Sequence, residues 1–197
     1  EVDPGSGIKM SIGDNSYQKF TAFHNTGVNE LGWSSSFLLG FWQGDGWRNG
    51  MQGEGTTYAF SVGYTPRGGN HEFNFSLIGA GQWHHQAYYG TQLQDYLDYG
   101  PIQGDDYRKF NALYGDYQGE EFSILRNYYN KPLATFNWDW EISSRVTLAT
   151  SLYGSAGRGG GTGLRGRGSY GVSPFRESYA EYLDDHGEWR NPDTTIN

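Results

Sequence analysis

Two carboxylates with catalytic potential lie close together in the chain, at Asp139 and Glu141. A β-strand places residues i and i+2 on one face, so these two side chains would be neighbours. Glycoside hydrolysis uses two carboxyl groups separated by about 5–9 Å that flank the scissile bond. We find no second acidic pair on separate strands that would line a sugar cleft. The pattern therefore favours solvated polar groups over a catalytic pair.

The adjacent histidines His84 and His85, which follow Trp83, could suggest a metal site. Successive strand residues point to opposite faces, so the two imidazoles cannot easily share one ion. The chain has no cysteine, which excludes a thiolate site. We therefore predict no metal and no cofactor, and we expect His84 to be a polar residue lining a binding surface.

A glycine-rich tract extends from Gly157 to Gly168. A phosphate-binding loop would need Lys followed by Ser or Thr after the last glycine, and then the start of a helix, and this tract has neither the Lys-Ser/Thr pair nor a helix start. An RNA-binding segment would need more Arg-Gly repeats in a basic chain, whereas the net charge is −8 and the pI is about 5.0. We predict a flexible loop leaving a strand, and no nucleic-acid partner.

Alternating segments predict the strands that would position these residues. Segment 135–142 places Phe136, Trp138, Trp140 and Ile142 on one face, with the carboxylates on the other. Similar alternation predicts strands at 36–42, 57–64, 72–77 and 146–153, and weaker ones at 7–12 and 17–25. The 31 glycines, 16 tyrosines, 11 phenylalanines and 7 tryptophans favour strands over helices, so we predict an all-β fold.

The links between these segments alternate between short and long. Links 26–32, 65–70 and 143–145 are short, whereas 44–55, about 87–130 and everything after 154 are long, polar and rich in Tyr, Gly and acids. Short turns at one end and long loops at the other are typical of outer-membrane barrels. We therefore predict an antiparallel up-and-down transmembrane β-barrel, here a partial barrel of about seven strands with long extracellular loops.

Several motifs, in this order and spacing, resemble the early barrel of TonB-dependent outer-membrane receptors, particularly those of Bacteroidota-type bacteria. The resemblance covers about 6–168. The motifs are Ser11-Ile-Gly-Asp-Asn-Ser-Tyr-Gln-Lys19, Trp42-Gln-Gly-Asp-Gly-Trp47, Gly79-Ala-Gly-Gln-Trp-His84, Tyr128-Tyr-Asn-Lys-Pro132 and Leu152-Tyr-Gly-Ser-Ala-Gly-Arg-Gly-Gly-Gly161.

The resemblance implies that residues 1–197 are part of a single receptor barrel domain in the cell outer membrane, without the plug and the remaining strands. It implies non-enzymatic, TonB-coupled uptake of a scarce nutrient, with siderophore, cobalamin, glycan and peptide all open. The implied partners are outer-membrane lipid, the small nutrient ligand, the TonB complex through a plug that this chain lacks, and a possible surface lipoprotein.

Strand parity predicts the residues that would contact the ligand. Trp42, Gln82, His84 and Tyr153 would all point inward near the long-loop end. Trp83 would face the lipid interface. Asp139 and Glu141 would also point inward, but near the short turns, where they would contact the plug or hydrate the lumen.

Two soluble interpretations remain as alternatives. The first is a secreted β-jelly-roll glycoside hydrolase, which fits the chain length and the Tyr, Trp and Gly content. The second is a carbohydrate-binding module whose exposed aromatic rings stack on sugars. Both are less favoured for two reasons. Every second residue in 136–142 and in 73–77 is apolar, which is more uniform than a sugar cleft requires, and the links alternate in length.

Overall fold

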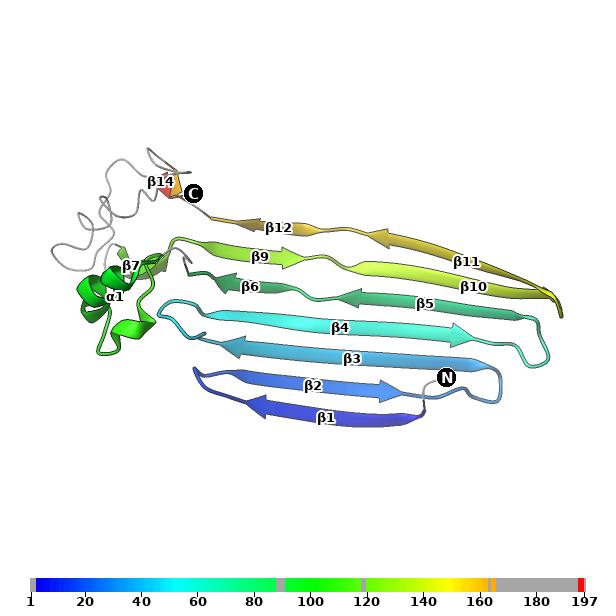
Figure 1. Ribbon diagram of the computed structural model, residues 1–197. Helices are drawn as coiled ribbons and strands as arrows, with labels where there is room; N and C mark the ends of the chain where they lie inside the picture. Colours follow the sequence, from blue (N-terminus) through cyan, green and yellow to red (C-terminus); the bar gives the residue numbers. More distant parts are fainter. Residues whose placement is uncertain (1–2, 88–90, 118–119, 163, 166–194, 197) are drawn as a thin grey trace.

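The computed structural model describes residues 3–87, 91–117, 120–162, 164–165 and 195–196. The fold is dominated by one large antiparallel sheet (Figure 1). Its strands are β1 (Gly5–Ile12), β2 (Gln18–Asn25), β3 (Trp33–Gly44), β4 (Gly53–Tyr64), β5 (His71–Gly79), β6 (Gln82–His85), β9 (Arg126–Asn130), β10 (Leu133–Ser143), β11 (Val146–Ser155) and β12 (Arg158–Gly161). Two further pairs, β7 (Tyr114–Tyr117) with β8 (Glu120–Ser123) and β13 (Leu164–Arg165) with β14 (Thr195–Ile196), lie outside it.

The ten strands of the large sheet lie in seven rows. A row here is a single strand or two strands that follow each other end to end. Strands β5 and β6 form one such row, β10 and β9 the next, and β11 and β12 the last, because the pairing register is the same on both sides of each interruption. The interruptions at 80–81, 131–132 and 156–157 lie side by side, and Pro132 in the middle one has no N–H to donate. The prediction of an all-β antiparallel fold is confirmed, and the sheet contains ten strands in seven rows where about seven strands were predicted. The sheet formed by the described strands is open, with β1 at one edge and β11–β12 at the other.

The links at the two ends of the sheet differ in length. At one end, the turn end, 26–32, 65–70 and 144–145 connect neighbouring rows. At the other, the cap end, the links are 13–17, 45–52 and 86–125. The predicted strict alternation was wrong at 13–17, which is as short as the turns. The loop predicted at 44–55 is also shorter, since β3 and β4 extend into it.

The glycine-rich tract contains a strand. Strand β12 pairs with β9, and the register joins Gly160 to Tyr128. The prediction of a flexible loop was therefore wrong for Arg158–Gly161. Glycines have no side chain that could reveal a face, so their sequence shows no alternation. Residues 163 and 166–168 of this tract lie outside the described residues.

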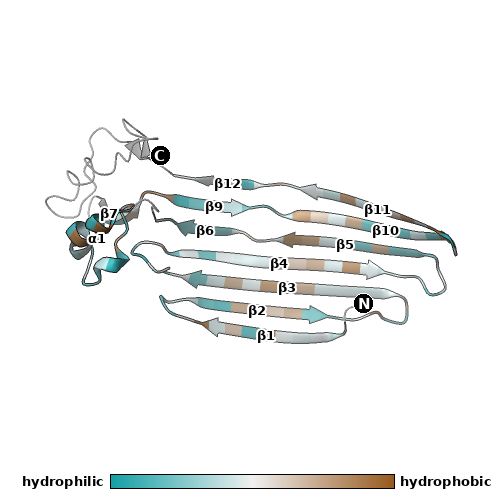
Figure 2. Ribbon diagram, in the orientation of Figure 1, coloured by the Kyte–Doolittle hydropathy of each residue, from teal (hydrophilic) through white to brown (hydrophobic). Residues whose placement is uncertain are grey.

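The register divides the sheet into two chemically different faces. The apolar face carries Ile8, Met10, Ile12, Phe20, Ala22, Phe37, Leu39, Phe41, Tyr58, Phe60, Val62, Phe73, Phe75, Leu77, Phe136, Trp138, Trp140, Leu148 and Leu152. The polar face carries Lys9, Ser11, Lys19, Thr21, Asn25, Ser34, Ser36, Thr57, Ser61, Glu72, Asn74, Ser76, Thr135, Asn137, Asp139 and Ser151. The polar face also has one line of apolar residues, which runs across neighbouring strands and consists of Phe23, Leu38, Ala59, Ile78 and Leu133. The brown and teal bands along single strands in Figure 2 follow this alternation.

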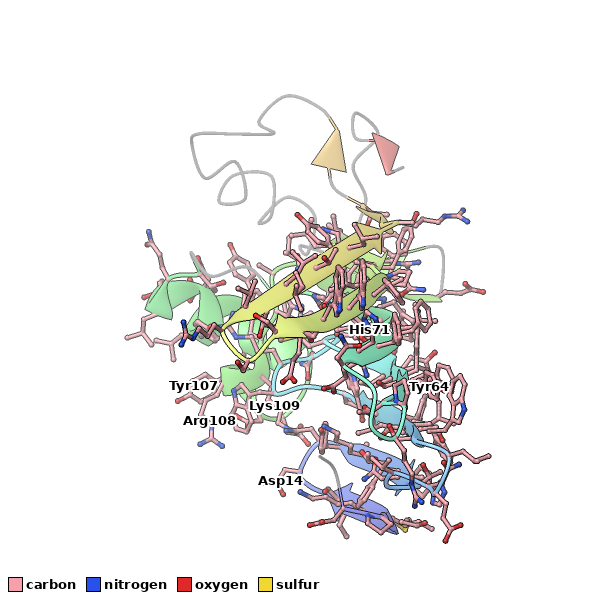
Figure 3. All side chains as sticks on the ribbon, turned by 90° about the vertical axis from the view of Figure 1, so that its right-hand side faces the viewer. Asp14, Tyr64, His71, Tyr107, Arg108 and Lys109 are labelled. Carbon is pink, nitrogen blue, oxygen red and sulfur yellow. The ribbon has the colours of Figure 1, made fainter. Side chains whose placement is uncertain are left out.

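The sheet is a single layer, and its large apolar side chains are not buried. Phe37 is 44% exposed, Phe60 45% and Leu39 57%. Viewed along the strands from the turn end, Tyr64 and His71 project to the same side of the sheet (Figure 3). None of the described residues forms a second layer over this face, so the sheet has no core of its own.

The buried core lies instead in the long link between β6 and β9, which we call the cap (described residues 86–87, 91–117 and 120–125). It contains α1 (Leu93–Tyr99), the short 3-10 helices η1 (Gly100–Ile102) and η2 (Tyr107–Lys109), and the β7–β8 hairpin. Its buried centre consists of Phe110, Ala112, Leu113 and Ile124. Figure 1 shows the cap at one end of the strands. The sequence had predicted an extended polar loop here.

Candidate functional site

Trp42 and Gln82, both predicted to contact ligand, lie on the polar face at the cap end. Gly55 on β4 is paired with both, so the three residues are direct neighbours on the adjacent strands β3, β4 and β6. A Cβ placed on Gly55 would lie 2.5 Å from Trp42 Nε1 and 2.9 Å from Gln82 Cβ. The indole therefore lies across Gly55 and reaches Gln82, an arrangement that only glycine at position 55 permits.

His84 lies next to this row and is held by two glutamines. Gln82 Nε2 is 3.4 Å from His84 Nδ1, and Gln86 Nε2 is 3.3 Å from His84 Nε2. A neutral imidazole donates at one nitrogen and accepts at the other. Both glutamines face the ring with their amide nitrogens, so one of them donates an N–H to the ring nitrogen that accepts. Two amides thus fix the imidazole and keep further polar groups available to a ligand.

Sequence reasoning missed Gln86 and two further members of this cluster. Tyr129 pairs with Gln82, and Asn127 pairs with His84, so both lie on the same face of β9. Tyr129 is 38% exposed. The signal was weak because Tyr128 and Tyr129 are adjacent, which hides the alternation. Pro132 directly downstream also made this segment resemble a loop.

Tyr153 lies on the polar face but apart from the other three residues. It pairs with Thr135, six residues from Tyr129 along the same row, which corresponds to about 20 Å at about 3.3 Å per residue. Its predicted position near the long loops was wrong, because the row continues through β12 to Gly161. Tyr153 is 81% exposed and lies in the edge row of the sheet, partway between the turn end and the cap end.

Asp139 and Glu141 lie near the turn end, as predicted, on the same face as Glu72, which pairs with Asp139. Both side chains are exposed. They project from one strand in the same direction and would lie on the same side of a substrate. Glycosidase carboxyl groups must flank the bond that they cleave. The geometry therefore gives this pair no catalytic arrangement.

His84 and His85 point to opposite faces, since His84 pairs with Asn127 and His85 with Arg126. The backbone N–H of His85 donates to the Gln52 carbonyl of the link 45–52. Burial lowers the pKa of His85, and the Arg126 guanidinium lowers it further. The described residues contain no group of three or more His, Cys, Asp or Glu side chains that could hold a metal ion.

The apolar face has a shallow groove of about 480 Å³ near the interruptions of the strands. Phe41, Trp83, Tyr128 and Arg158 are among its lining residues. By register these four side chains lie on the face opposite to Trp42. The groove is therefore separate from the cluster of Trp42, Gln82, His84, Gln86, Asn127 and Tyr129, which we call the Trp42 cluster.

Comparisons with models of known protein families, with curated proteins and with solved structures gave no match. Within the described residues, no helix is both long and apolar enough to cross a membrane. The Trp42 cluster combines aromatic rings, amides and an imidazole, which are groups common in ligand-binding sites.

Proposed function

We propose that this chain forms part of the wall of an outer-membrane β-barrel of the TonB-dependent receptor kind, which takes up a scarce nutrient. One observation carries the proposal: the apolar face extends across seven rows of strands and is covered by none of the described residues. Water is a poor solvent for such a surface, whereas lipid chains would solvate it. The opposite face is polar, as expected for the lumen of a barrel.

The height of the apolar face matches a bilayer. On β4 this face extends from Tyr64 at the turn end to Glu54 at the cap end, with apolar side chains from Tyr64 to Tyr58 and the polar Thr56 and Glu54 beyond them. These ten residue steps correspond to about 33 Å at about 3.3 Å per residue. A strand tilted by about 40° would then span about 25 Å along the membrane normal, which is the typical height of the apolar band of a barrel.

Aromatic side chains border this band at both ends. At the turn end, the rings of Trp33 and Tyr64 stack with centroids 4.4 Å apart, and those of Phe73 and Trp138 with centroids 6.3 Å apart. Trp138 also donates its Nε1–H to His71 Nδ1 at 3.1 Å. At the cap end, Trp83 and Tyr128 occupy paired positions on the same face. Aromatic girdles at both interfaces are a feature of membrane barrels.

Polar ladders on the opposite face support a water-facing interior. The Ser76 and Thr135 hydroxyls are 2.5 Å apart, and Asn74 donates to the Ser61 hydroxyl at 3.1 Å. These side chains satisfy one another between neighbouring strands without a covering layer. The open edges at β1 and β11–β12 would pair with further barrel strands, because bilayer interiors do not accommodate unpaired strand edges.

The soluble alternatives receive less support. A jelly-roll or a carbohydrate-binding sandwich buries apolar side chains between two packed sheets. In the part of the chain that the structure describes, the large sheet has no such partner, and its apolar residues stay half-exposed. Coupling to TonB through a plug, and a surface lipoprotein near the cap, are further parts of the proposal that rest on the resemblance of the sequence.

Quenching of tryptophan fluorescence by brominated lipids tests the proposal. The chain is folded into phosphatidylcholine vesicles with or without bromine on the acyl chains. We expect strong quenching that falls in the Trp138→Phe variant, because Trp138 would contact lipid. Trp42→Phe is the matched control, and it should leave the lipid-dependent quenching in place. A chain that stays in the aqueous phase on flotation, with no quenching, would refute membrane insertion.

A further inference from the structure

The Trp42 cluster has a flat aromatic surface fixed against the sheet. The indole lies over Gly55 on the polar side of the sheet, and its Nε1 and Cε2 are its atoms nearest to that residue. Trp42 is half-buried, and its Nε1–H has no hydrogen-bond partner in the part of the chain that the structure describes. A half-buried indole beside the sheet is suited to stacking on the C–H face of a ring while its Nε1–H donates to an oxygen.

Hydrogen-bonding groups lie beside this surface in a short array. Gln82 lies next to the indole, His84 is held between Gln82 and Gln86, and Tyr129 is on the far side of Gln82. The Trp42 ring over β4 and Tyr129 on β9 are separated by two strand spacings, about 10 Å. A ligand with more than one ring could therefore contact both aromatic groups and the amides between them.

Among the described residues, none at the centre of the cluster is a carboxylate or a permanent cation. Lys19 pairs with Trp42 at one margin, and the Lys131 stem lies beside Gly157 at the other. The side-chain amides of Gln82 and Gln86 both donate and accept, which matches hydroxyl groups, since these also do both. An anionic or iron-chelating ligand would be better served by cations at the centre.

We propose that the Trp42 cluster binds a neutral, polyhydroxylated chain ligand, that is, an oligosaccharide. The ligand would stack on Trp42, would hydrogen-bond to Gln82 and Gln86, and would extend toward Tyr129. The assignment rests on the proposed function, because it places the cluster inside a receptor lumen. The cap begins directly beside the cluster, where the Gln86 N–H donates to the Leu125 carbonyl at 2.9 Å, so a ligand there would lie next to a folded wall.

Isothermal titration of the full chain in detergent micelles tests the assignment with four probes: maltohexaose, cellohexaose, xylohexaose and the acidic control tetragalacturonate. We expect saturable binding of at least one neutral hexasaccharide. Trp42→Ala should weaken this binding by about tenfold or more, as expected for a central aromatic contact. Trp42→Phe should restore part of it, and Gln82→Ala should weaken it as well.

Tyr153→Ala is the matched control, since Tyr153 is on the same face but about 20 Å away, and it should change affinity less than twofold. Far-ultraviolet circular dichroism of each variant separates lost contacts from lost folding. The assignment would be overturned if no neutral hexasaccharide bound at about 10 mM, if Trp42→Ala and Trp42→Phe both bound like the parent, or if only the acidic probe bound. The bilayer experiment above is independent, so binding without membrane insertion would reject the transport proposal alone.

Discussion

Replacing Phe60 with arginine gives the largest expected difference between a membrane wall and a soluble sheet. Phe60 lies on the apolar face, four steps from Tyr64 and six from Glu54, so it would be close to the bilayer midplane. An arginine at this depth costs about 2–4 kcal/mol in membrane barrels. The folding equilibrium in vesicles should therefore fall by roughly 30- to 900-fold.

Thr57→Arg is the matched control. Thr57 lies three residues away on the same strand, but it is exposed on the polar face. Its replacement should change the free energy of unfolding by about 0.5 kcal/mol or less, as is usual for solvated positions. Both variants add the same charge, so the difference between them reports the environment of the two faces.

The assay is equilibrium unfolding by urea in phosphatidylcholine vesicles, followed by tryptophan fluorescence. If the sheet were soluble, the half-exposed Phe60 could be replaced at almost no cost, and both variants would unfold like the parent chain. Equal stability of Phe60→Arg and Thr57→Arg would therefore refute the assignment of the apolar face to lipid.

Three further predictions concern the cap and its junction with the sheet. The Asn111→Ala change should destabilise the cap by about 1–3 kcal/mol, seen as faster amide hydrogen exchange of 107–114, because the fully buried Asn111 side chain donates to the Asn49 carbonyl at 2.8 Å. Gly55→Val should displace the Trp42 indole and shift its fluorescence, whereas an unchanged spectrum would show that the ring does not lie on Gly55. Burial lowers the pKa of His85, so the unfolded chain binds more protons below about pH 6.5, and stability should fall from there toward the lowered pKa. His85→Gln should flatten this dependence in urea unfolding measured at pH 7.5 and 5.5, and a parallel pH profile of variant and parent would contradict it.

The strand rows could be predicted from sequence because each face has a distinct composition. Segment 135–142 alternates without a break, and the structure places it in β10 with the two expected faces. The short link 65–70 was predicted for a similar reason, since Pro66, Gly68 and Gly69 indicate a turn. Period-two alternation is a local property, so it requires no knowledge of neighbouring strands.

The cap could not be predicted because its structure depends on contacts distant in sequence. Asn111 and Asn49 are 62 residues apart, and their hydrogen bond joins the cap to the link between β3 and β4. The buried centre is small, and its residues occur singly or in short runs within a polar tract. Neither helical nor strand periodicity is long enough there to give a signal.

Part of the candidate site was predictable by parity alone. Trp42, Gln82 and His84 could be assigned to one face, but their proximity depends on Gly55, which aligns β3 with β6 through β4. Tyr153 was misplaced because the glycines of β12 conceal the end of the row. The face of a strand residue is thus encoded locally, whereas its position along the sheet depends on where the strand ends.

The most direct measurement of the central claim is a spin-label scan of β4 in lipid bilayers. The chain has no native cysteine, so single cysteines introduced at 57–64 can each carry one label. Collision with oxygen, which concentrates in lipid, should peak at 58, 60, 62 and 64. Collision with a water-soluble nickel chelate should peak at 57, 59, 61 and 63. Two profiles that oscillate in opposite phase are the predicted result, whereas equal access of the nickel chelate to all eight positions would contradict a membrane-facing apolar wall.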